Sequence, residues 1–474
     1  MRFPPLSPIV SALAMAALGL PGCASLQQPA VAPAALQVPA AWSLNGADSA
    51  SQTAALAAWW QRFDEPALPP LVLQALQGST DIAAAQARLR QARALRDSTA
   101  AGRLPTVTGS GSAQASRNEG SATVQRYGAD IDARWEADLW GGIAAGVRAA
   151  DATTRASETT LAATRVSVAA EVAVNLLQLR GTQARLALAR DSLASQRQTL
   201  QIVQWRAEAG LVTQLDVEQA KTAVEQTRAQ IPALETSATQ TMNALAVLTG
   251  RAPGALTTEL AATMPARAPV TPPGLALALP AEVLRQRPDV HAAEQRLLAA
   301  AARVDQADAE RLPGLSLGGS IGLNALSLSA LGSAQAAASL LASVSLPLFD
   351  GGRLRAQVRQ QEAARDEAEA GYRGTLLIAL QEVEDALVAL RGTREQLAAQ
   401  QSAVASALNA AQIAEQRYRS GLVDFSNVLL TQRTLLSAQD GVAATATTLA
   451  TQHVRLYKAL GGGWTPDTPD EPRP

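Results

Sequence analysis

The chain has 474 residues, a formal net charge of −1, 47% hydrophobic residues and only 3% aromatic residues. A near-neutral chain with 17% charged residues lacks the basic surface that nucleic acid requires, so we expect no nucleic-acid partner. Small and aliphatic residues therefore carry the apolar content, which is typical of long helices.

The first 22 residues are predicted to be a secretory signal. Arg2 precedes an apolar stretch from Ile9 to Leu20, which is too short to span a bilayer as a helix. The stretch ends in "LPGC", whose Cys23 is the only cysteine of the chain. These residues resemble a bacterial lipobox, which implies that Cys23 carries a diacylglycerol thioether. Ala24 at the next position favours sorting to the outer membrane.

Residues 23–55, rich in Ala, Pro, Ser and Gln, are predicted to form a lipidated tether. A helical pattern over residues 81–102 leads into two predicted strands at about 104–138. The second strand contains "YGADIDARWEADLW" from Tyr127, in which apolar or aromatic residues alternate with charged ones. A period of two indicates a strand whose faces meet different solvents, as in a soluble sheet or a membrane barrel. The charged positions are Asp130, Asp132, Arg134, Glu136 and Asp138.

Three further segments show the same alternation, at about 104–115, 315–324 and 339–348. Each has about ten residues, the length of a tilted transmembrane strand. After Cys23 no uninterrupted apolar run reaches the ~18 residues of a membrane-spanning helix. If the chain spans a membrane, we therefore expect it to do so as strands. Closing a barrel takes about eight strands, so several chains must share one.

A long helical hairpin is predicted after each strand pair, at 141–249 and at 351–460. No proline interrupts 141–210 or 351–421, so each first helix can extend about 100 Å. Apolar residues recur every seven positions in both, which predicts a coiled-coil seam, although a soluble bundle also fits the heptads alone. The heptad residues are Val172, Leu179, Leu186, Leu193 and Leu200, then Val383, Leu390, Leu397, Val404 and Ala411.

The chain is an internal duplication. "DIAAAQARLRQARA" from Asp81 recurs as "DVHAAEQRLLAAAA" from Asp289, an offset of 208 (289 − 81). The glycines that mark the hairpin turns, Gly210 and Gly421, differ by 211 (421 − 210). We therefore predict two tandem repeats, 56–250 and 288–464, joined by a connection at 251–287 and followed by a disordered acidic tail at 465–474.

Catalytic or metal-binding chemistry is not indicated. His291 and His453 lie singly on helical patterns without a second ligand at metal-binding spacing, so both are predicted to be helix-surface residues. The Gly-rich stretches at 109–113 and 318–322 lack the strand-then-helix context of a phosphate loop. We predict that the chain is not an enzyme and uses no cofactor or metal.

Six motifs carry a family resemblance that runs in order from Trp59 to Trp464. They are "WWQRFDEPALPPLVLQAL", "LRQRPDVHAAEQRLLAA", "ERLPGLSLGGSIGL", "SLPLFDGGRLRAQV", "RYRSGLVDFSNVLLTQRTLL" and "YKALGGGW". Together they resemble the TolC-like outer-membrane factors, in particular the lipoprotein branch of multidrug efflux channels. The resemblance implies a mostly α chain with four β-strands. Three such chains share one 12-strand membrane β-barrel, continuous with a periplasmic α-barrel of long coiled-coil helices.

The same resemblance implies a passive exit duct for drugs or other small toxic solutes, lipid-anchored in the outer membrane and extending into the periplasm. An inner-membrane pump, expected to be of the RND type, would drive it through a periplasmic adaptor, the membrane fusion protein. The segment before residue 81, the 251–287 connection and the C-terminal end are expected to form an equatorial region around the tunnel.

The hairpin turns at "GLVTQLD" and "GLVDFSN" are the expected adaptor contacts, through Gly210, Leu211, Val212, Gly421, Leu422 and Val423. The resemblance also implies a closed-state gate in which Asp216 and Tyr418 form a hydrogen bond between neighbouring tip helices. A second arginine latch of the family is in doubt, because Val423 occupies its position. Asp424 fits either an acidic ring at the constriction or a solvated tip residue.

The charged strand positions from Asp130 to Asp138 are expected to line the barrel lumen, either as solvated residues or as a filter that disfavours anions. Two alternative functions remain open on sequence alone. One is the exit duct of a type I protein secretion system. The other is a structural periplasmic coiled-coil lipoprotein, which would have no need of four alternating segments placed identically in two repeats.

Overall fold

The computed structural model describes residues 42, 56, 58–117, 119–120, 122–262, 269–270, 284, 286–334 and 336–464. The predicted signal at 1–22, Cys23, all of the predicted tether except Trp42, and the tail at 465–474 lie outside the described residues. So does most of the connection after residue 262.

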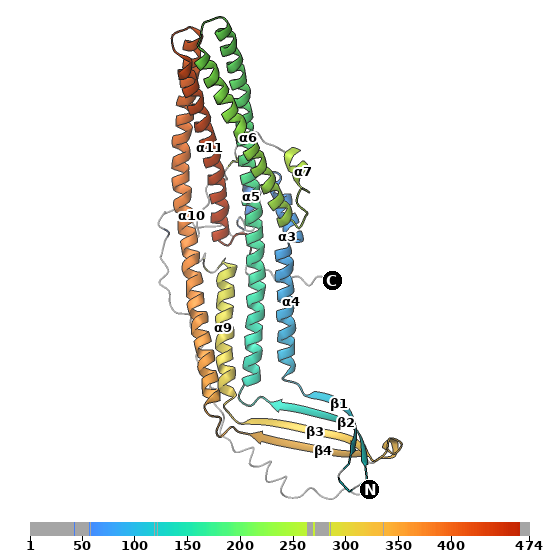
Figure 1. Ribbon diagram of the computed structural model, residues 1–474. Coiled ribbons are helices and arrows are strands. Elements are labelled where there is room, and N and C mark those ends of the chain that lie inside the picture. The colour runs from blue at the N-terminus through green and yellow to red at the C-terminus, as the bar shows by residue number, and fades with distance from the viewer. Residues whose placement is uncertain are drawn as a thin grey trace. The chain divides into compact units, whose positions relative to one another are not determined.

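The described helices and strands repeat in the same order (Figure 1). The first repeat contains η1 (Trp59–Arg62), α3 (Leu68–Gly78), α4 (Thr80–Ala101), β1 (Thr106–Ser116), β2 (Val124–Ala137), α5 (Gly142–Glu208) and α6 (Gln214–Leu248), followed by α7 (Thr257–Ala262) in the connection. The second contains α9 (Pro288–Ala309), β3 (Gly314–Ala325), η2 (Leu331–Ser333), β4 (Ala336–Ser345), α10 (Arg353–Arg419) and α11 (Phe425–Ala459). Corresponding helices have equal lengths, 22 residues in α4 and α9, 67 in α5 and α10, and 35 in α6 and α11. The predicted tandem duplication is therefore confirmed.

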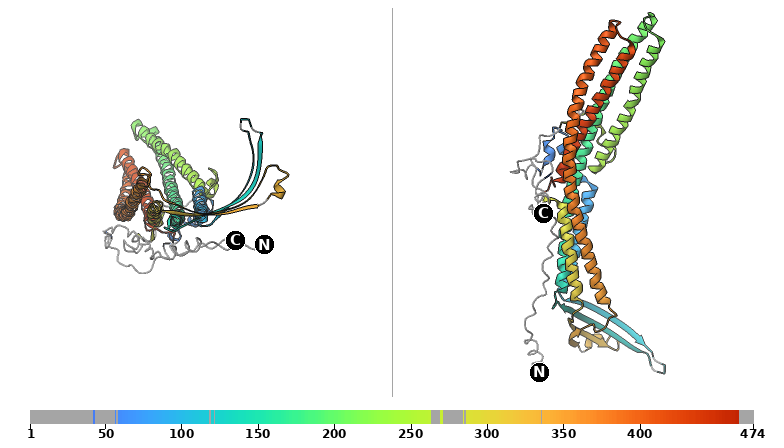
Figure 2. Two further views of the ribbon diagram at one scale, coloured as in Figure 1. Left: turned by 90° about the horizontal axis from the view of Figure 1, so that it is seen from below. Right: turned by 90° about the vertical axis from the view of Figure 1, so that its left-hand side faces the viewer.

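The four strands form one antiparallel sheet in the order β1-β2-β3-β4, and the sheet is curved (Figure 2). Its register keeps the period of two across all strands. Asp132 lies opposite Thr108 and Ser320, whereas Ile131 lies opposite Gly109 and Ile321. One face is thus polar and the other apolar, as the alternation predicts.

The apolar face of the sheet is uncovered within one chain. Val107 is 68% exposed, Val344 72% and Leu340 88%. The outer strands β1 and β4 each have a neighbour on one side only among the described residues. Backbone groups along an unpaired edge have no hydrogen-bond partner in lipid, so in a membrane this sheet would need further strands from other chains. The fourth strand ends at Ser345, earlier than the alternation at 339–348 predicts.

The long helices pack as the heptads predict. Val172, Leu179 and Val383 are fully buried, and Leu390 is 5% exposed. Helix α5 packs against α4, α6, α9 and α11, and α10 packs against α9 and α11. Among the described helices, α5 alone contains a stretch that is apolar and long enough to cross a membrane, but 56% of that stretch is buried inside the chain. Burial by neighbouring helices accounts for its apolar character.

Segments from both ends of the described chain meet on the middle of α5. The ring of Trp59 stacks on that of Tyr457 of α11, with their centroids 5.4 Å apart. Trp60 meets the Trp59 ring edge-on, with the centroids 5.7 Å apart. Nearby, the Arg180 guanidinium donates from Nε to Glu65 Oε2 at 3.0 Å and from Nη2 to Glu65 Oε1 at 3.1 Å. Arg180 Nη1 also donates to the carbonyl of Leu260 in α7 at 3.2 Å. One buried arginine thus joins α5 to the N-terminal segment and the connection.

The prediction that His453 lies on a helix surface is wrong. Its side chain is 2% exposed, because it lies on the buried side of α11, which packs against α5 and α10. Arg394 Nη2 of α10 lies 3.3 Å from its Nε2. Burial, with the positive charges of Arg394 and Arg62, lowers the pKa of His453 from 6.5 to about 4. The folded protein therefore holds a neutral imidazole. His291 is half-buried, with its ring 5.6 Å from that of Trp464.

This low pKa predicts a loss of stability in acid. As the pH falls below 6.5, His453 becomes protonated in the unfolded chain, whereas in the folded chain it stays neutral until about pH 4. At 1.36 kcal/mol per pKa unit, the loss at pH 5 is about 2 kcal/mol per chain. We expect His453→Gln to narrow the difference in thermal unfolding midpoint between pH 7.5 and pH 5, whereas His291→Gln leaves it unchanged. Equal acid sensitivity in the wild type and His453→Gln would contradict this assignment.

Candidate functional site

The polar face of the sheet brings together four of the five predicted lumen residues. Asp130, Asp132, Arg134 and Glu136 all lie on β2. The first three have partners on both β1 and β3, and Glu136 has a partner on β3. Their cross-strand neighbours are hydroxyl residues or glycines. A side chain in place of Gly322 would collide with Asp130 Oδ1, so this glycine gives the carboxylate its space. The face carries both signs of charge and is suited to contact water.

Asp138 differs from the other four, because it lies beyond the end of β2. Its carboxylate accepts hydrogen bonds from the N–H groups of Ile143 at 3.1 Å and Ala144 at 2.7 Å. Asp350 serves α10 in the same way, through the N–H groups of Gly352 and Leu354. Both carboxylates satisfy free donors at the positive end of a 67-residue helix. Asp138 therefore caps the N-terminus of α5.

The two hairpin turns share one geometry. Gly210 and Gly421 have φ of 72° and 71°, and the N–H of the next leucine donates to the carbonyl five residues earlier, at 2.8 and 2.9 Å. Only glycine adopts this left-handed conformation without strain, which explains the residue at both turns.

Leucine and valine differ in exposure at the turns. Leu211 and Leu422 are 72% and 74% exposed. Val212 and Val423 are instead half-buried, because they pack against an apolar cluster that joins the two hairpins. The leucines therefore present more apolar surface at the turns than the valines do. We call this group the tip cluster; its buried members are Val203, Val217, Ala220, Ala223, Tyr418, Phe425, Val428 and Leu429.

The predicted gate residues lie near the tips but are not bonded to each other within one chain. The Tyr418 hydroxyl is buried and has no hydrogen-bond partner among the described residues. Asp216 Oδ2 accepts from the N–H and hydroxyl of Thr213, at 2.9 and 2.8 Å, in a capping box at the start of α6. Asp424 is the N-cap residue of α11, as Thr213 is of α6, but its side chain makes no capping hydrogen bond.

Arg206 is a tip residue that the sequence did not reveal. Its guanidinium carbon lies 4.7 Å from the centre of the Tyr418 ring, and it donates to the Tyr418 and Arg419 carbonyls at 3.4 Å each. It thus links the end of α5 to the end of α10 through a cation–π contact and the negative helix terminus. Many helices have a basic residue in the last turn, so the sequence does not mark Arg206 as special. Only the packing of the two hairpins shows its contact with Tyr418.

A curved two-faced sheet with open edges, continuous with paired helices of 67 residues, defines a subunit of a TolC-like outer-membrane channel. The family model described as "outer membrane efflux protein" matches residues 71–251 and 279–462. The chain belongs to this family, whose members are trimeric channels of pump systems. The predicted fold class is confirmed, and the protein is located in the outer membrane.

Individual relatives are similar to this chain over most of their length. The pyoverdine export outer membrane protein OpmQ of Pseudomonas putida is 34% identical over 445 residues, which cover 91% of this chain and 93% of OpmQ. The toluene efflux pump outer membrane protein TtgC of the same species is 32% identical, covering 95% of each chain. Among solved structures, the outer-membrane channel OprN matches with a TM-score of 0.81 and 34% identity, covering 94% of this chain and 99% of OprN. VceC of Vibrio cholerae matches with a TM-score of 0.79 and 29% identity, covering 86% of this chain and 99% of VceC.

Proposed function

We propose that three copies of this chain form the outer-membrane exit duct of a tripartite efflux system for small organic or toxic solutes. The observation that carries this proposal is the four-stranded sheet, whose polar and apolar faces and open edges require a shared barrel. An RND-type inner-membrane pump would supply the energy through a periplasmic adaptor. Relatives named for pyoverdine export and for toluene efflux support small solutes as cargo.

Two parts of this duct follow from its residues. Asp130, Asp132, Arg134 and Glu136 line the barrel lumen from the polar face of the sheet. Cys23 carries the lipid that anchors the chain beside its barrel, as its position after "LPG" supports. The mass of the N-terminal peptide of the purified protein checks the lipid, and an unmodified Cys23 thiol would contradict it.

The adaptor binds at the exposed leucines of the two tips. Leu211 and Leu422 stand on opposite hairpins above the tip cluster, and each offers a small apolar contact to a partner helix. We expect the double variant Leu211→Asp/Leu422→Asp to lose drug tolerance while trimer levels in the outer membrane stay normal. A buried interface leucine replaced by a charge costs about 2 kcal/mol or more, or about 30-fold in adaptor affinity.

The matched control is Val270→Asp, which places the same charge on an exposed apolar residue of the connection, away from the tips. Drug susceptibility, adaptor crosslinking and trimer content are measured in a strain that lacks the native chain. Full drug tolerance in the double variant would remove the tips from the adaptor interface.

A further inference from the structure

A groove of about 290 Å³ lies between α4, α5 and α9, away from the tips and the sheet. Among the described residues, its lining includes three arginines and no carboxylate. Alanines at 85, 156 and 299 form part of its wall and leave space between the longer side chains. The polar lining residues are Arg88 of α4, Arg296 and Arg303 of α9, and Thr153, Ser157 and Thr160 of α5.

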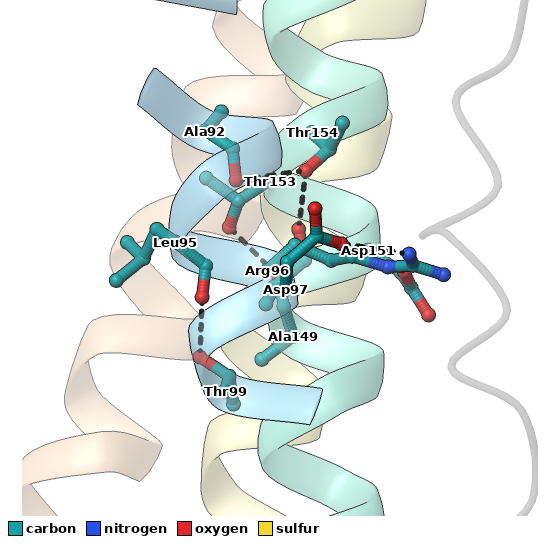
Figure 3. A network of polar contacts seen from close by, with 10 residues as sticks. Ala92, Leu95, Arg96, Asp97, Thr99, Ala149, Asp151, Thr153 and Thr154 are labelled. Atoms are coloured by element: carbon teal, nitrogen blue, oxygen red, sulfur yellow. Dashed lines mark hydrogen bonds and ion pairs between the residues drawn. The ribbon is translucent and has the colours of Figure 1, made fainter. Parts of the chain in front are cut away.

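The charges of this groove are not neutralised within the described chain. Arg88 and Arg303 make no ion pair with any described residue, and Arg296 donates to the Thr160 hydroxyl at 3.1 Å. Two other arginines of α4, Arg93 and Arg96, form ion pairs with carboxylates of α5. Figure 3 shows Arg96 of α4 bonded to Asp151 of α5, at 2.8 Å. Three arginines that share one groove without a carboxylate create a local positive potential.

The groove lies on a defined side of α5. Thr153, Ser157 and Thr160 follow the i, i+4, i+7 pattern of one helix face. Arg180 lies twenty residues after Thr160, which at about 100° per residue places it about 200° around the helix. That opposite side carries Glu65 and the segment that packs around the middle of α5. The groove therefore opens on the side away from the equatorial segment, which in the proposed duct is the tunnel.

We infer that this groove is a transit site for small oxyanions, solutes that bear carboxylate, sulfate or phosphate groups. The inference rests on the proposed exit duct and narrows its cargo. Guanidinium groups bind such oxygens with two parallel hydrogen bonds. The three hydroxyls already donate to carbonyls of their own helix, so the guanidinium groups supply the donors of the groove. The arginines are solvent-exposed, so binding is weak enough for release. Threefold symmetry would repeat the groove around the tunnel.

Ion selectivity in planar bilayers tests this inference. The triple variant Arg88→Gln/Arg296→Gln/Arg303→Gln is compared with Arg155→Gln. Arg155 is exposed on α5 two residues before Ser157, about 200° from it. In a gradient of dilute potassium chloride, we expect the triple variant to lower the chloride-to-potassium permeability ratio by about twofold or more, since nine charges are lost per trimer. Citrate added to one side should reduce current in the wild type and in Arg155→Gln, and less in the triple variant.

A second measurement does not depend on conduction. Purified trimers are treated with phenylglyoxal, which modifies arginine, and the modified peptides are counted by mass spectrometry. We expect citrate to slow modification of the three groove arginines and to leave Arg155 unaffected. Equal permeability ratios and equal citrate effects in all variants, or no protection by citrate, would overturn the oxyanion site. Trimers that conduct nothing when open would contradict the exit duct itself, while the protection result would still decide the groove.

Discussion

Replacing Arg180 with methionine is expected to destabilise the folded chain by about 3–5 kcal/mol, since it leaves a buried carboxylate without its partner. The Arg180 and Glu65 side chains are 1% and 9% exposed and are joined by two hydrogen bonds. Trimer content and the midpoint of unfolding in guanidinium, measured in detergent, report the effect. We expect the segment around Glu65, between η1 and α3, to become accessible to protease first.

Two variants make this result specific to the buried pair. Arg190→Met breaks an exposed pair with Glu235, whose side chains are 53% and 47% exposed, and should cost less than about 1 kcal/mol. Arg180→Met/Glu65→Leu removes both charges and should recover most of the loss, because no buried charge then stays unpaired. If Arg180→Met is as stable as Arg190→Met, the ion pair does not hold the segment around Glu65 against α5.

Removing the Tyr418 hydroxyl is expected to open the channel. We propose that, in the closed trimer, this hydroxyl donates to the Asp216 carboxylate on a neighbouring tip helix. This hydroxyl has no hydrogen-bond partner among the described residues, so its donor is left unsatisfied in a single subunit. A hydrogen bond to a charged group contributes roughly 1.5 to 3 kcal/mol, so its loss should raise the open population about ten- to a hundredfold. Tyr418→Phe should therefore increase single-channel conductance and sensitivity to large antibiotics.

The companion variant Asp216→Asn should act in the same direction, although it also weakens the capping box with Thr213. Tyr372→Phe is the control, since Tyr372 lies on α10 some 46 residues before Tyr418 (418 − 372). Wild-type conductance in both tip variants would show that other contacts, such as that between Arg206 and the Tyr418 ring, hold the channel closed.

Periodic features were predictable from the sequence because each depends on residues close together in the chain. The alternation around Asp132 and Ile131 identified β2 and both faces of the sheet, and the heptads identified the buried side of α5. The boundaries were less certain, since Asp138 continues the alternation after the strand has ended.

Contacts between distant residues were not predictable. Glu65 and Arg180 are 115 positions apart, and no local pattern marks either as buried. His453 has the sequence surroundings of a surface histidine, and it is buried only because other helices cover it. Arg206 meets Tyr418 through the packing of two separate hairpins. The same limit applies to the arginine groove, whose members come from three helices.

The open edges of the sheet have a genetic consequence. A lone subunit would expose unpaired backbone groups of β1 and β4 to lipid, so insertion and assembly have to occur together, and each barrel is completed by all three subunits at once. In a cell that makes equal amounts of normal and defective subunits, random mixing leaves only about one barrel in eight with three normal copies. A tip or gate variant that still assembles should therefore behave as dominant, whereas one that cannot fold should be recessive.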